Sequence, residues 1–424
     1  DECDLSPTTL TPVTTLSAGG LPAGLIAADL NGDGNPELIY ANVTNNSVDI
    51  FINDGQGGFG FQSILAGVQP AAVVAFDADG DGDLDLATAN SATDNVSILI
   101  NVTPPGAGSL VFEPAVDVET GAMPVALLAA DFDGDGDLDL AVANYLGNTI
   151  SRLINVGGGV FAPDTTGQVV GIQPIALASG DFDNDGLPDL AVANFSSNNL
   201  SVLLSSGATV DPTLATFGGP FSLAAGDFNN DGSDDLAVVN ANLDNILILL
   251  NTGAGSLQEH VALTGLVGIS VVQTITPPGS SNVGLLAADE DEVMIFAGVG
   301  NGDFQLAQRA SVEPGVNSVA SGNFTTSELQ VAALKEVAQS LTIFTVAEGI
   351  ETDCNANGVP DSCEPDSNGN GVIDDCEGPG SPGPACGAGA GVGCGAGGAG
   401  LLPAGLIGLG SLKRTTRRRR RQYA

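Results

Sequence analysis

The stretch Asp131-Phe-Asp133-Gly-Asp135-Gly136-Asp137-Leu-Asp139 decides the fold, because it is one of five copies of a single acidic motif. Side-chain oxygens stand at positions 1, 3, 5 and 9 of each copy, and glycine stands at position 6. Calcium takes six to eight oxygen ligands, and glycine permits the tight reversal that turns those oxygens inward. The motif therefore predicts a calcium loop. A solvated acidic turn is the alternative, and five copies in one register speak against it.

Every copy offers the same five predicted ligand positions. Position 7 is expected to contribute its backbone carbonyl, so its side chain is free to vary. The predicted ligands are Asp29, Asn31, Asp33, Asn35 and Glu37 in the first copy; Asp77, Asp79, Asp81, Asp83 and Asp85 in the second; Asp131, Asp133, Asp135, Asp137 and Asp139 in the third; Asp181, Asp183, Asp185, Leu187 and Asp189 in the fourth; and Asp227, Asn229, Asp231, Ser233 and Asp235 in the fifth.

The repeat is longer than the motif. An Asn follows the first Asp of each copy by thirteen residues, and an apolar run begins nineteen residues after that Asp, as at Asn144 and Ile150. A fixed period indicates a repeat architecture, and β-branched runs between Gly and Asn turns indicate strands. Each unit is expected to hold four strands, A to D, with the motif as the A–B loop. Strands A and C are apolar on both faces, which predicts small sheets stacked radially as a β-propeller.

Two further units lack the acidic loop, with Pro277-Pro-Gly-Ser-Ser and Thr325-Thr-Ser in its place. Strand A is expected to begin near residues 22, 70, 124, 174, 220, 268 and 316. The sequence therefore predicts an all-β, seven-bladed propeller over 10–348, with calcium loops in blades one to five. The seventh unit has no strand D of its own. The N-terminal strand is expected to complete that blade and remove an exposed sheet edge.

Residues 131–142 and the phrase Phe217-Gly-Gly-Pro resemble FG-GAP/VCBS repeats, the propeller type of integrin α subunits and many bacterial surface proteins. The resemblance covers residues 10–345 and implies binding more often than catalysis. Some calcium propellers of this kind are polysaccharide lyases, so that activity stays open. Blades six and seven depart from the family pattern, which puts a metal there in doubt.

Two acidic motifs of another kind form a predicted module at 353–377. Each ends in Glu at position 12, the bidentate ligand of an EF-hand loop, but no amphipathic helix flanks them. They resemble thrombospondin type 3 or dockerin-like loops of planctomycete-type surface proteins; a rigid stalk is favoured over a dockerin, which would need a cohesin partner. The predicted ligands are Asp353, Asn355, Asn357, Val359, Asp361 and Glu364, then Asp366, Asn368, Asn370, Val372, Asp374 and Glu377.

The two ends of the chain predict how it is processed and displayed. Residues 1–9 match the end of such a tail motif, so they are interpreted as the remainder of an upstream calcium repeat; a mature N-terminus that matches by chance is the alternative.

Residues 378–391 form a Gly/Pro linker. Residues 392–424 join an apolar stretch to an Arg cluster and look like a bacterial sorting signal of the PEP-CTERM or MYXO-CTERM kind, with membrane contact through this segment only. A basic RNA-binding tail is the rival interpretation.

Charge and composition exclude several function classes. The net charge is −41, and residues 413–421 hold seven of the ten Lys and Arg, so nucleic acid is excluded as a partner by repulsion. His260 is the only histidine, which argues against a Ser/His/Asp triad or a His-ligated zinc. Calcium is abundant outside cells, so the composition favours a secreted monomer anchored at the cell surface or outer envelope.

The sequence thus predicts a non-enzymatic binding propeller whose ligand is an extracellular protein or polysaccharide. A calcium-dependent polysaccharide lyase and a purely structural envelope protein are the alternatives. On the face opposite the calcium loops, Tyr145 and Phe195 occupy equivalent turn positions in adjacent blades. Exposed aromatic rings are common anchors of recognition sites, so both are candidate ligand-binding residues. Rings that fold onto their own blades are the alternative.

Overall fold

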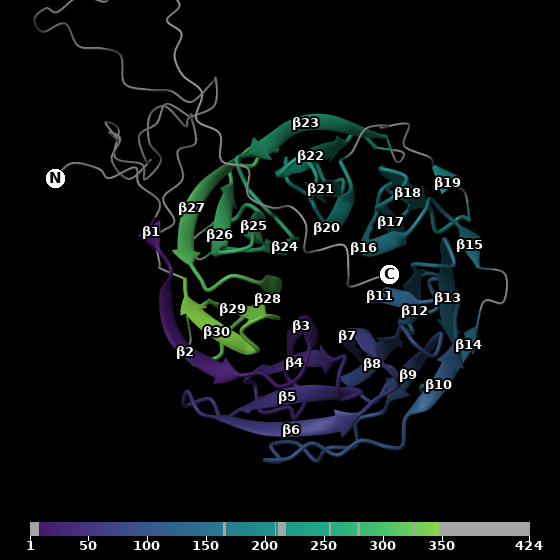
Figure 1. Ribbon diagram of the computed structural model, residues 1–424. Coiled ribbons are helices and arrows are strands. Elements are labelled where there is room, and N and C mark those ends of the chain that lie inside the picture. The colour runs from purple at the N-terminus through teal and green to yellow at the C-terminus, as the bar shows by residue number, and fades with distance from the viewer. Residues whose placement is uncertain are drawn as a thin grey trace, which may run out of the picture. The chain divides into compact units, whose positions relative to one another are not determined.

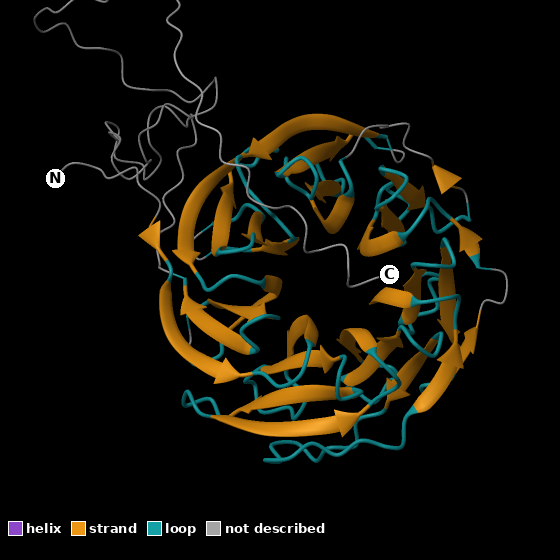
Figure 2. Cartoon of the chain, in the orientation of Figure 1, coloured by secondary structure: helices purple, strands orange, loops and turns teal. Residues whose placement is uncertain are grey.

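The computed structural model describes residues 8–163, 167–207, 209–210, 218–253, 256–277, 280–325 and 328–346. In these ranges all regular secondary structure is β-strand (Figure 2), and no helix there could cross a membrane. The strands form seven sheets arranged in a ring (Figure 1), which confirms the predicted all-β, seven-bladed propeller. The tail motifs, the linker and the basic C-terminal segment lie outside the described residues.

Each blade is an antiparallel sheet whose strands follow one another from the centre of the ring outward (Figure 1). Blade one contains β3 (Pro22–Ala28), β4 (Glu37–Asn42), β5 (Ser47–Asn53) and β6 (Phe59–Leu65); blade two β7 (Pro70–Phe76), β8 (Asp85–Asn90), β9 (Asn95–Leu99) and β10 (Val116–Glu119); blade three β11 (Pro124–Ala130), β12 (Asp139–Asn144), β13 (Thr149–Asn155), β14 (Phe161–Pro163) and β15 (Gln168–Val169); and blade four β16 (Pro174–Gly180), β17 (Asp189–Asn194), β18 (Asn199–Leu203) and β19 (Thr209–Val210).

The other three blades follow the same order. Blade five contains β20 (Pro220–Gly226), β21 (Asp235–Asn240), β22 (Asn245–Asn251) and β23 (Leu257–Thr264); blade six β24 (Val271–Ile275), β25 (Gly284–Ala288), β26 (Glu292–Gly298) and β27 (Phe304–Ser311); and blade seven β28 (Val316–Gly322), β29 (Gln330–Lys335) and β30 (Ser340–Thr345). Six innermost strands begin at the predicted residue. The sixth begins at Val271 instead of 268, because Gly268 adopts a positive φ of 77° in a turn before the strand.

The N-terminal segment joins blades six and seven. Its strand β2 (Thr11–Ser17) pairs antiparallel with β30 and supplies the outer strand of blade seven. The short strand β1 (Thr8–Thr9) pairs in parallel with β27 of blade six, a contact that the sequence did not predict. Between the two strands, Leu10 is fully buried, and its backbone N–H donates to the Arg309 carbonyl at 3.0 Å. The segment therefore pairs with two blades, and not only with the last one.

The hydrophobic core lies in the seams, by which we mean the interfaces between adjacent blades. In the described ranges each seam holds its own cluster of buried apolar residues, including the seam between blades seven and one, where Leu25 and Leu341 pack together. The second strand of every acidic blade is buried along its whole length, as β12 is. The predicted burial of strand A is only partly right, because the innermost strands have neighbours on fewer sides and are partly exposed.

A second set of contacts joins the blades at the end of the strands opposite the A–B loops, which we call the turn face. There, in each of the five acidic blades, the last residue of the B–C turn has a positive φ, and its side-chain oxygen accepts a backbone N–H from the segment that enters the next blade. These five bonds are Gln69 to Asn46, Met123 to Asp94, Gln173 to Asn148, Gly219 to Asn198 and Gly268 to Asp244, with donor–acceptor distances of 2.7–2.9 Å.

Deletion of residues 1–18 should open the ring. The deletion removes β1 and β2, exposes the unpaired edge of β30 and uncovers the cluster around Leu341. We expect aggregation or a broad, less cooperative unfolding transition, measured by light scattering and by thermal unfolding. A truncated protein that stays monomeric and equally stable would show that closure does not depend on this segment.

Candidate metal centres in the A–B loops

Each acidic loop is held in shape by its own carboxylates. In blade three, Asp131 accepts the backbone N–H of Gly136 at 3.0 Å, and Gly136 has a φ of 98°, which side chains with a Cβ rarely adopt. Asp135 accepts the N–H of Asp137 at 2.9 Å. The same two bonds recur in the other four loops. The loop therefore presents its acidic side chains from a fixed backbone.

The carboxylate at position 9 is the buried centre of each site. Asp139 is 0% exposed and accepts two backbone N–H groups, from Phe132 at 3.2 Å and from Asn155 at 2.8 Å. It thus ties the loop to the strand C end of the same blade. Glu37, Asp85, Asp189 and Asp235 are equally buried and accept the corresponding backbone groups.

Three loops bring carboxylates from positions 1, 3 and 9 together. In each of them one oxygen per residue lies within 4.8 Å of the others; the groups are Asp77, Asp79 and Asp85; Asp131, Asp133 and Asp139; and Asp181, Asp183 and Asp189. Carboxylate oxygens are the ligands that calcium prefers. The donor set therefore fits a hard divalent cation. The loops of blades one and five have the amides Asn31 and Asn229 at position 3 and so present one carboxylate fewer.

The other two predicted ligand positions of blades one to five, positions 5 and 7, are not among the gathered carboxylates. The position-5 residues, such as Asp135, are exposed and do not join the gathered carboxylates. The position-7 residues, Asn35, Asp83, Asp137, Leu187 and Ser233, donate their backbone N–H to the position-5 carboxylate. Metal coordination by their carbonyls stays a prediction. The twelve predicted ligands of the tail module, from Asp353 to Glu377, lie outside the described residues.

Burial raises the pKa of the position-9 carboxyls. Desolvation is the largest cause in every case, and the neighbouring carboxylates of the loop add to it, whereas the backbone N–H donors oppose it. The pKa of Glu37 rises to about 7, and those of Asp85, Asp139 and Asp235 rise to about 6. A cation among these groups would favour their ionised forms.

An Asn that the sequence analysis did not single out links the sites of blades two, three and five to the preceding blade. The Asn155 side chain donates to the carbonyl of Ala78 in blade two at 2.8 Å and to Leu138 in its own blade at 3.2 Å. Asn101 and Asn251 make the same bonds to Leu30 and Phe182 of their preceding blades. The signal was present, because Asn follows the first Asp by 24 residues in four of the five repeats. Blade four has Ser205 there.

Blade seven, which has no acidic loop, replaces the carboxylate by a neutral side chain. In blade seven the Gln330 side-chain oxygen accepts the backbone N–H groups of Phe324 and Thr325 at 3.0 and 2.7 Å. The Gln330 amide nitrogen donates to the Thr325 hydroxyl at 2.7 Å. An uncharged side chain therefore performs the bracing role of position 9, and this loop needs no cation to relieve charge repulsion.

The two candidate ligand residues of the turn face differ in exposure. Tyr145 is 7% exposed and is bonded to Gln173, so the structure places it as a packed ring, because the next blade's entry segment covers it. Phe195 is partly exposed and packs edge-on against Phe221 of the next blade at 6.1 Å between ring centroids. The exposed apolar residue beside Tyr145 is Leu146, which is 59% exposed. A binding role for these residues stays a prediction.

Comparison with protein families supports the repeat. The FG-GAP-like repeat model matches residues 29–88, 77–142, 131–192 and 181–238. Every match begins at the first Asp of an acidic loop and ends in the second strand of the following blade. The chain therefore carries FG-GAP-like repeats from the first acidic loop to the fifth, and blades six and seven lie outside the matched residues. No curated protein matches the chain in sequence.

Solved structures share the fold. BBS1N in complex with ARL6DN superposes with a TM-score of 0.59 at 16% identity, covering 81% of this chain and 99% of BBS1N. Virginiamycin B lyase from Staphylococcus aureus gives a TM-score of 0.55 at 12% identity and covers 79% of this chain and 99% of the lyase. A streptogramin B lyase gives 0.53 at 14%, with 80% and 97% covered. Identities this low show the fold alone.

Replacement of Asn155 by Ala should destabilise the seam between blades two and three. It removes the side-chain donor to the Ala78 carbonyl, which keeps only the Gly159 backbone N–H at 3.1 Å, so the lost bond should cost about 1 kcal/mol in the free energy of unfolding. Ser205→Ala is the matched control in blade four, because it keeps the Ser205 backbone N–H, which donates to Asp189 at 2.7 Å, and loses only a hydroxyl that donates to Asp185 of its own blade at 3.0 Å. Chemical denaturation measures both. Equal losses in the two variants would contradict the bridging role of the Asn side chain.

Stability should depend on pH in opposite ways with and without calcium. The folded-state pKa values of Asp85, Asp139 and Asp235 lie above the unfolded value, so their contribution to stability is complete below about pH 4 and is lost as the pH rises through about 6. The metal-depleted protein should therefore melt at a higher temperature at about pH 5 than at about pH 8. The difference in melting temperature between the calcium-loaded and the metal-depleted protein, measured by scanning fluorimetry, should become smaller as the pH falls. A difference that does not change with pH would contradict this prediction.

Proposed function

We propose that this chain is a calcium-stabilised binding propeller that works outside the cell and is displayed on a bacterial surface. The observation that carries the proposal is the fivefold recurrence of a braced loop with a buried carboxylate at position 9, and in three of the five loops further carboxylates gather around it. Calcium is the cation that best suits such oxygen donors on flexible side chains. It would offset the repulsion within each loop and much of the net charge of −41.

A binding role is supported better than a catalytic one. The only histidine, His260, lies on the outer strand β23 and forms an exposed pair with Asp303 at 2.9 Å. The acidic groups gathered within the described ranges are the predicted calcium ligands themselves. The lyase alternative is kept because two propellers that share the fold are named as lyases. Turnover of an acidic polysaccharide would favour it, and retention without turnover would favour the binder.

The turn face is the proposed recognition surface. The predicted metals lie at the opposite ends of the strands, so they would support the ring without contacting the ligand. Apolar side chains stand exposed on this face, with Leu146, Ile172 and Leu243 each more than half exposed. The interblade bonds of the turn residues hold this surface in place, which lowers the entropic cost of binding. An extracellular protein or polysaccharide is the proposed ligand.

Surface display rests on the sequence of the tail. The proposed order is propeller, two further calcium loops resembling thrombospondin type 3 repeats, a Gly/Pro linker and a sorting segment with its Arg cluster. In a planctomycete-type surface protein this arrangement would place the propeller at the end of a stalk. Cell fractionation of the natural host with an antibody to the propeller tests it, since recovery in the cytosol alone would contradict display.

Removal of calcium should destabilise the fold and reveal the number of sites. We expect seven calcium ions per chain by elemental analysis, five in the acidic loops and two in the tail module. A site at a hundred times its Kd stabilises the folded state by about 2.7 kcal/mol, so excess EGTA should lower the melting temperature markedly. Asp135→Ala should lose one ion, whereas the exposed control Glu259→Ala should lose none. An unchanged melting curve in EGTA would end the calcium proposal.

Substitutions on the turn face should separate binding from folding. Glycan and protein arrays, probed with and without calcium, first supply a ligand. Leu146→Ser with Phe195→Ala should then abolish retention of that ligand and leave the calcium content unchanged, with only a small fall in melting temperature from the lost contact between Phe195 and Phe221. Tyr145→Ala should instead lower the melting temperature, because its ring is buried. Full retention by the double variant would direct the search to another surface.

A further inference from the structure

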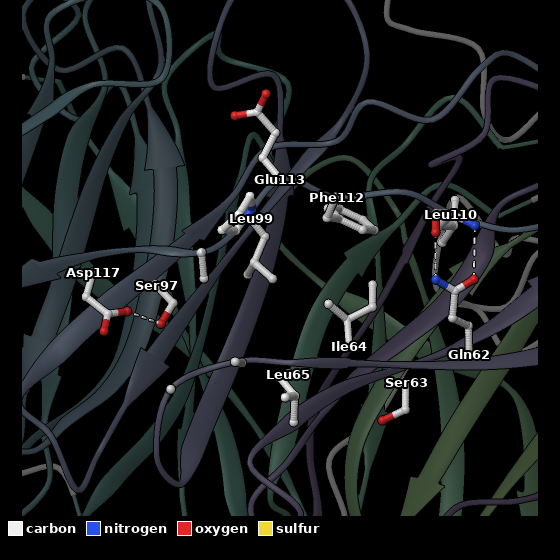
Figure 3. A pocket seen from close by; sticks show the side chains of 14 residues that line it. Gln62, Ser63, Ile64, Leu65, Ser97, Leu99, Leu110, Phe112, Glu113 and Asp117 are labelled. Carbon is white, nitrogen blue, oxygen red and sulfur yellow. Dashed lines mark hydrogen bonds between the residues drawn. The ribbon is translucent and has the colours of Figure 1, made fainter.

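We propose that a groove on the outer rim, between blades one and two, binds a small organic cation: an apolar body that carries an amidinium, guanidinium or ammonium group. The rim groove lies between β6 of blade one and the segment 110–117 of blade two, with Ser97 and Leu99 of β9 in its wall (Figure 3). Its volume of about 530 Å³ falls in the range of small-molecule sites.

A defect in the outer strand of blade two opens the groove. Phe112 bridges to Asn101, and Val116 pairs with Ile98, so strand D holds one residue more than strand C between these two pairs. Pro114 lies within this bulge and has no N–H to offer the ladder. The outer strand therefore leaves the sheet after Glu113, whose N–H still donates to the Ile100 carbonyl at 2.8 Å, and rejoins it at Val116. Bulges of this kind are common beside binding sites.

The walls of the groove are fixed by hydrogen bonds across the seam. The Gln62 side chain of blade one pairs with the backbone of Leu110 in blade two, donating to its carbonyl at 2.7 Å and accepting its N–H at 2.9 Å (Figure 3). The long hairpin that carries Leu110 is also held to the first acidic loop, where Gly106 donates to the Asn31 carbonyl at 2.7 Å. A preformed site binds with less loss of entropy.

The lining combines apolar contact with negative charge. Ile64, Leu99 and Phe112 lie between the Gln62–Leu110 pair and the Ser97–Asp117 pair (Figure 3). The carboxylates of Glu113 and Asp117 are exposed at the edge of the groove, and no Lys or Arg is among its lining residues. The Ser97 hydroxyl donates to Asp117 at 2.6 Å and so orients that carboxylate.

This combination selects a cation with an apolar body. The apolar body would displace water from Ile64 and Leu99, and the cation would meet a carboxylate in a charge-assisted hydrogen bond. The Phe112 ring adds a favourable face for a cation. Acidic polysaccharides and phosphates are repelled by the two carboxylates and by the net charge of the chain. The groove uses no predicted calcium ligand and no turn-face residue, so it stands apart from the proposed recognition surface.

The test compares three probes of one shape in saturating calcium. Benzamidine is the cation, benzamide is its neutral counterpart and benzoate is the anion; binding to the full chain is measured by calorimetry and by protein-observed NMR. We expect one benzamidine per chain, with shifts at Ile64 and Leu99, and binding of benzamide weaker by about tenfold, the factor expected for loss of a charge-assisted bond. Equal affinities for benzamidine and benzamide, or no binding at millimolar concentration, would overturn the proposal.

Variants distinguish the groove from general attraction to an acidic protein. Glu113→Gln with Asp117→Asn should weaken benzamidine at least tenfold, since both replacements keep the shape. The control Glu259→Gln with Glu290→Gln removes the same charge from exposed positions elsewhere and should leave the affinity unchanged. Ala115→Trp should block the groove at an unaltered melting temperature. If the control pair weakens binding as much as the groove pair, the attraction is not local and the proposal fails.

Discussion

A buried carboxylate that accepts backbone N–H groups from two separate segments is the interaction on which the acidic blades depend. At Asp139 these segments are the acidic loop, which donates through Phe132, and the end of strand C, which donates through Asn155, sixteen residues after Asp139. Such a group is costly to bury unless it is bonded or its charge is compensated, and its pKa of about 6 reflects that cost. A cation at the loop would remove the cost. The position-9 carboxylate thus shapes the acidic loop and joins that loop to strand C of the same blade.

The same residues connect one blade to the next. Phe182, at position 2 of its loop, fills the seam with its ring, gives its N–H to Asp189 and receives a bond from Asn251 of the following blade on its carbonyl. On the turn face, five further hydrogen bonds join the B–C turn of one blade to the segment that enters the next blade. Blades four and five, for example, are therefore held together at both ends of their strands and by a core between them. A ring built in this way gains stability from neighbours and not from any single sheet.

The predicted metal sites, the exposed apolar residues of the turn face and the rim groove lie on different parts of the propeller. The acidic loops and their predicted cations lie at one end of the strands, and the exposed apolar residues of the turn face lie at the other. The rim groove comes from the long hairpin and the bulge at Pro114 in blade two; the outer strand pairs of blades five and six also contain a bulge, but there the pairing resumes at once. Variation of this kind on a regular frame is how propellers acquire individual binding sites, because loops can change without disturbing the seams.

The sequence by itself determined the repeat, the strand order, the number of blades and the residues of the acidic loops. It could do so because a fixed period and glycine at position 6 are local properties of the chain. Only the tertiary structure decided which carboxylates converge, that Tyr145 is buried while Leu146 is exposed, and that β1 pairs with blade six. It also revealed the Asn155 bridge and the rim groove. Each of these depends on where a neighbouring blade lies. A single sequence can mark the position of a residue, as the recurring Asn does, but not the partner that the residue contacts.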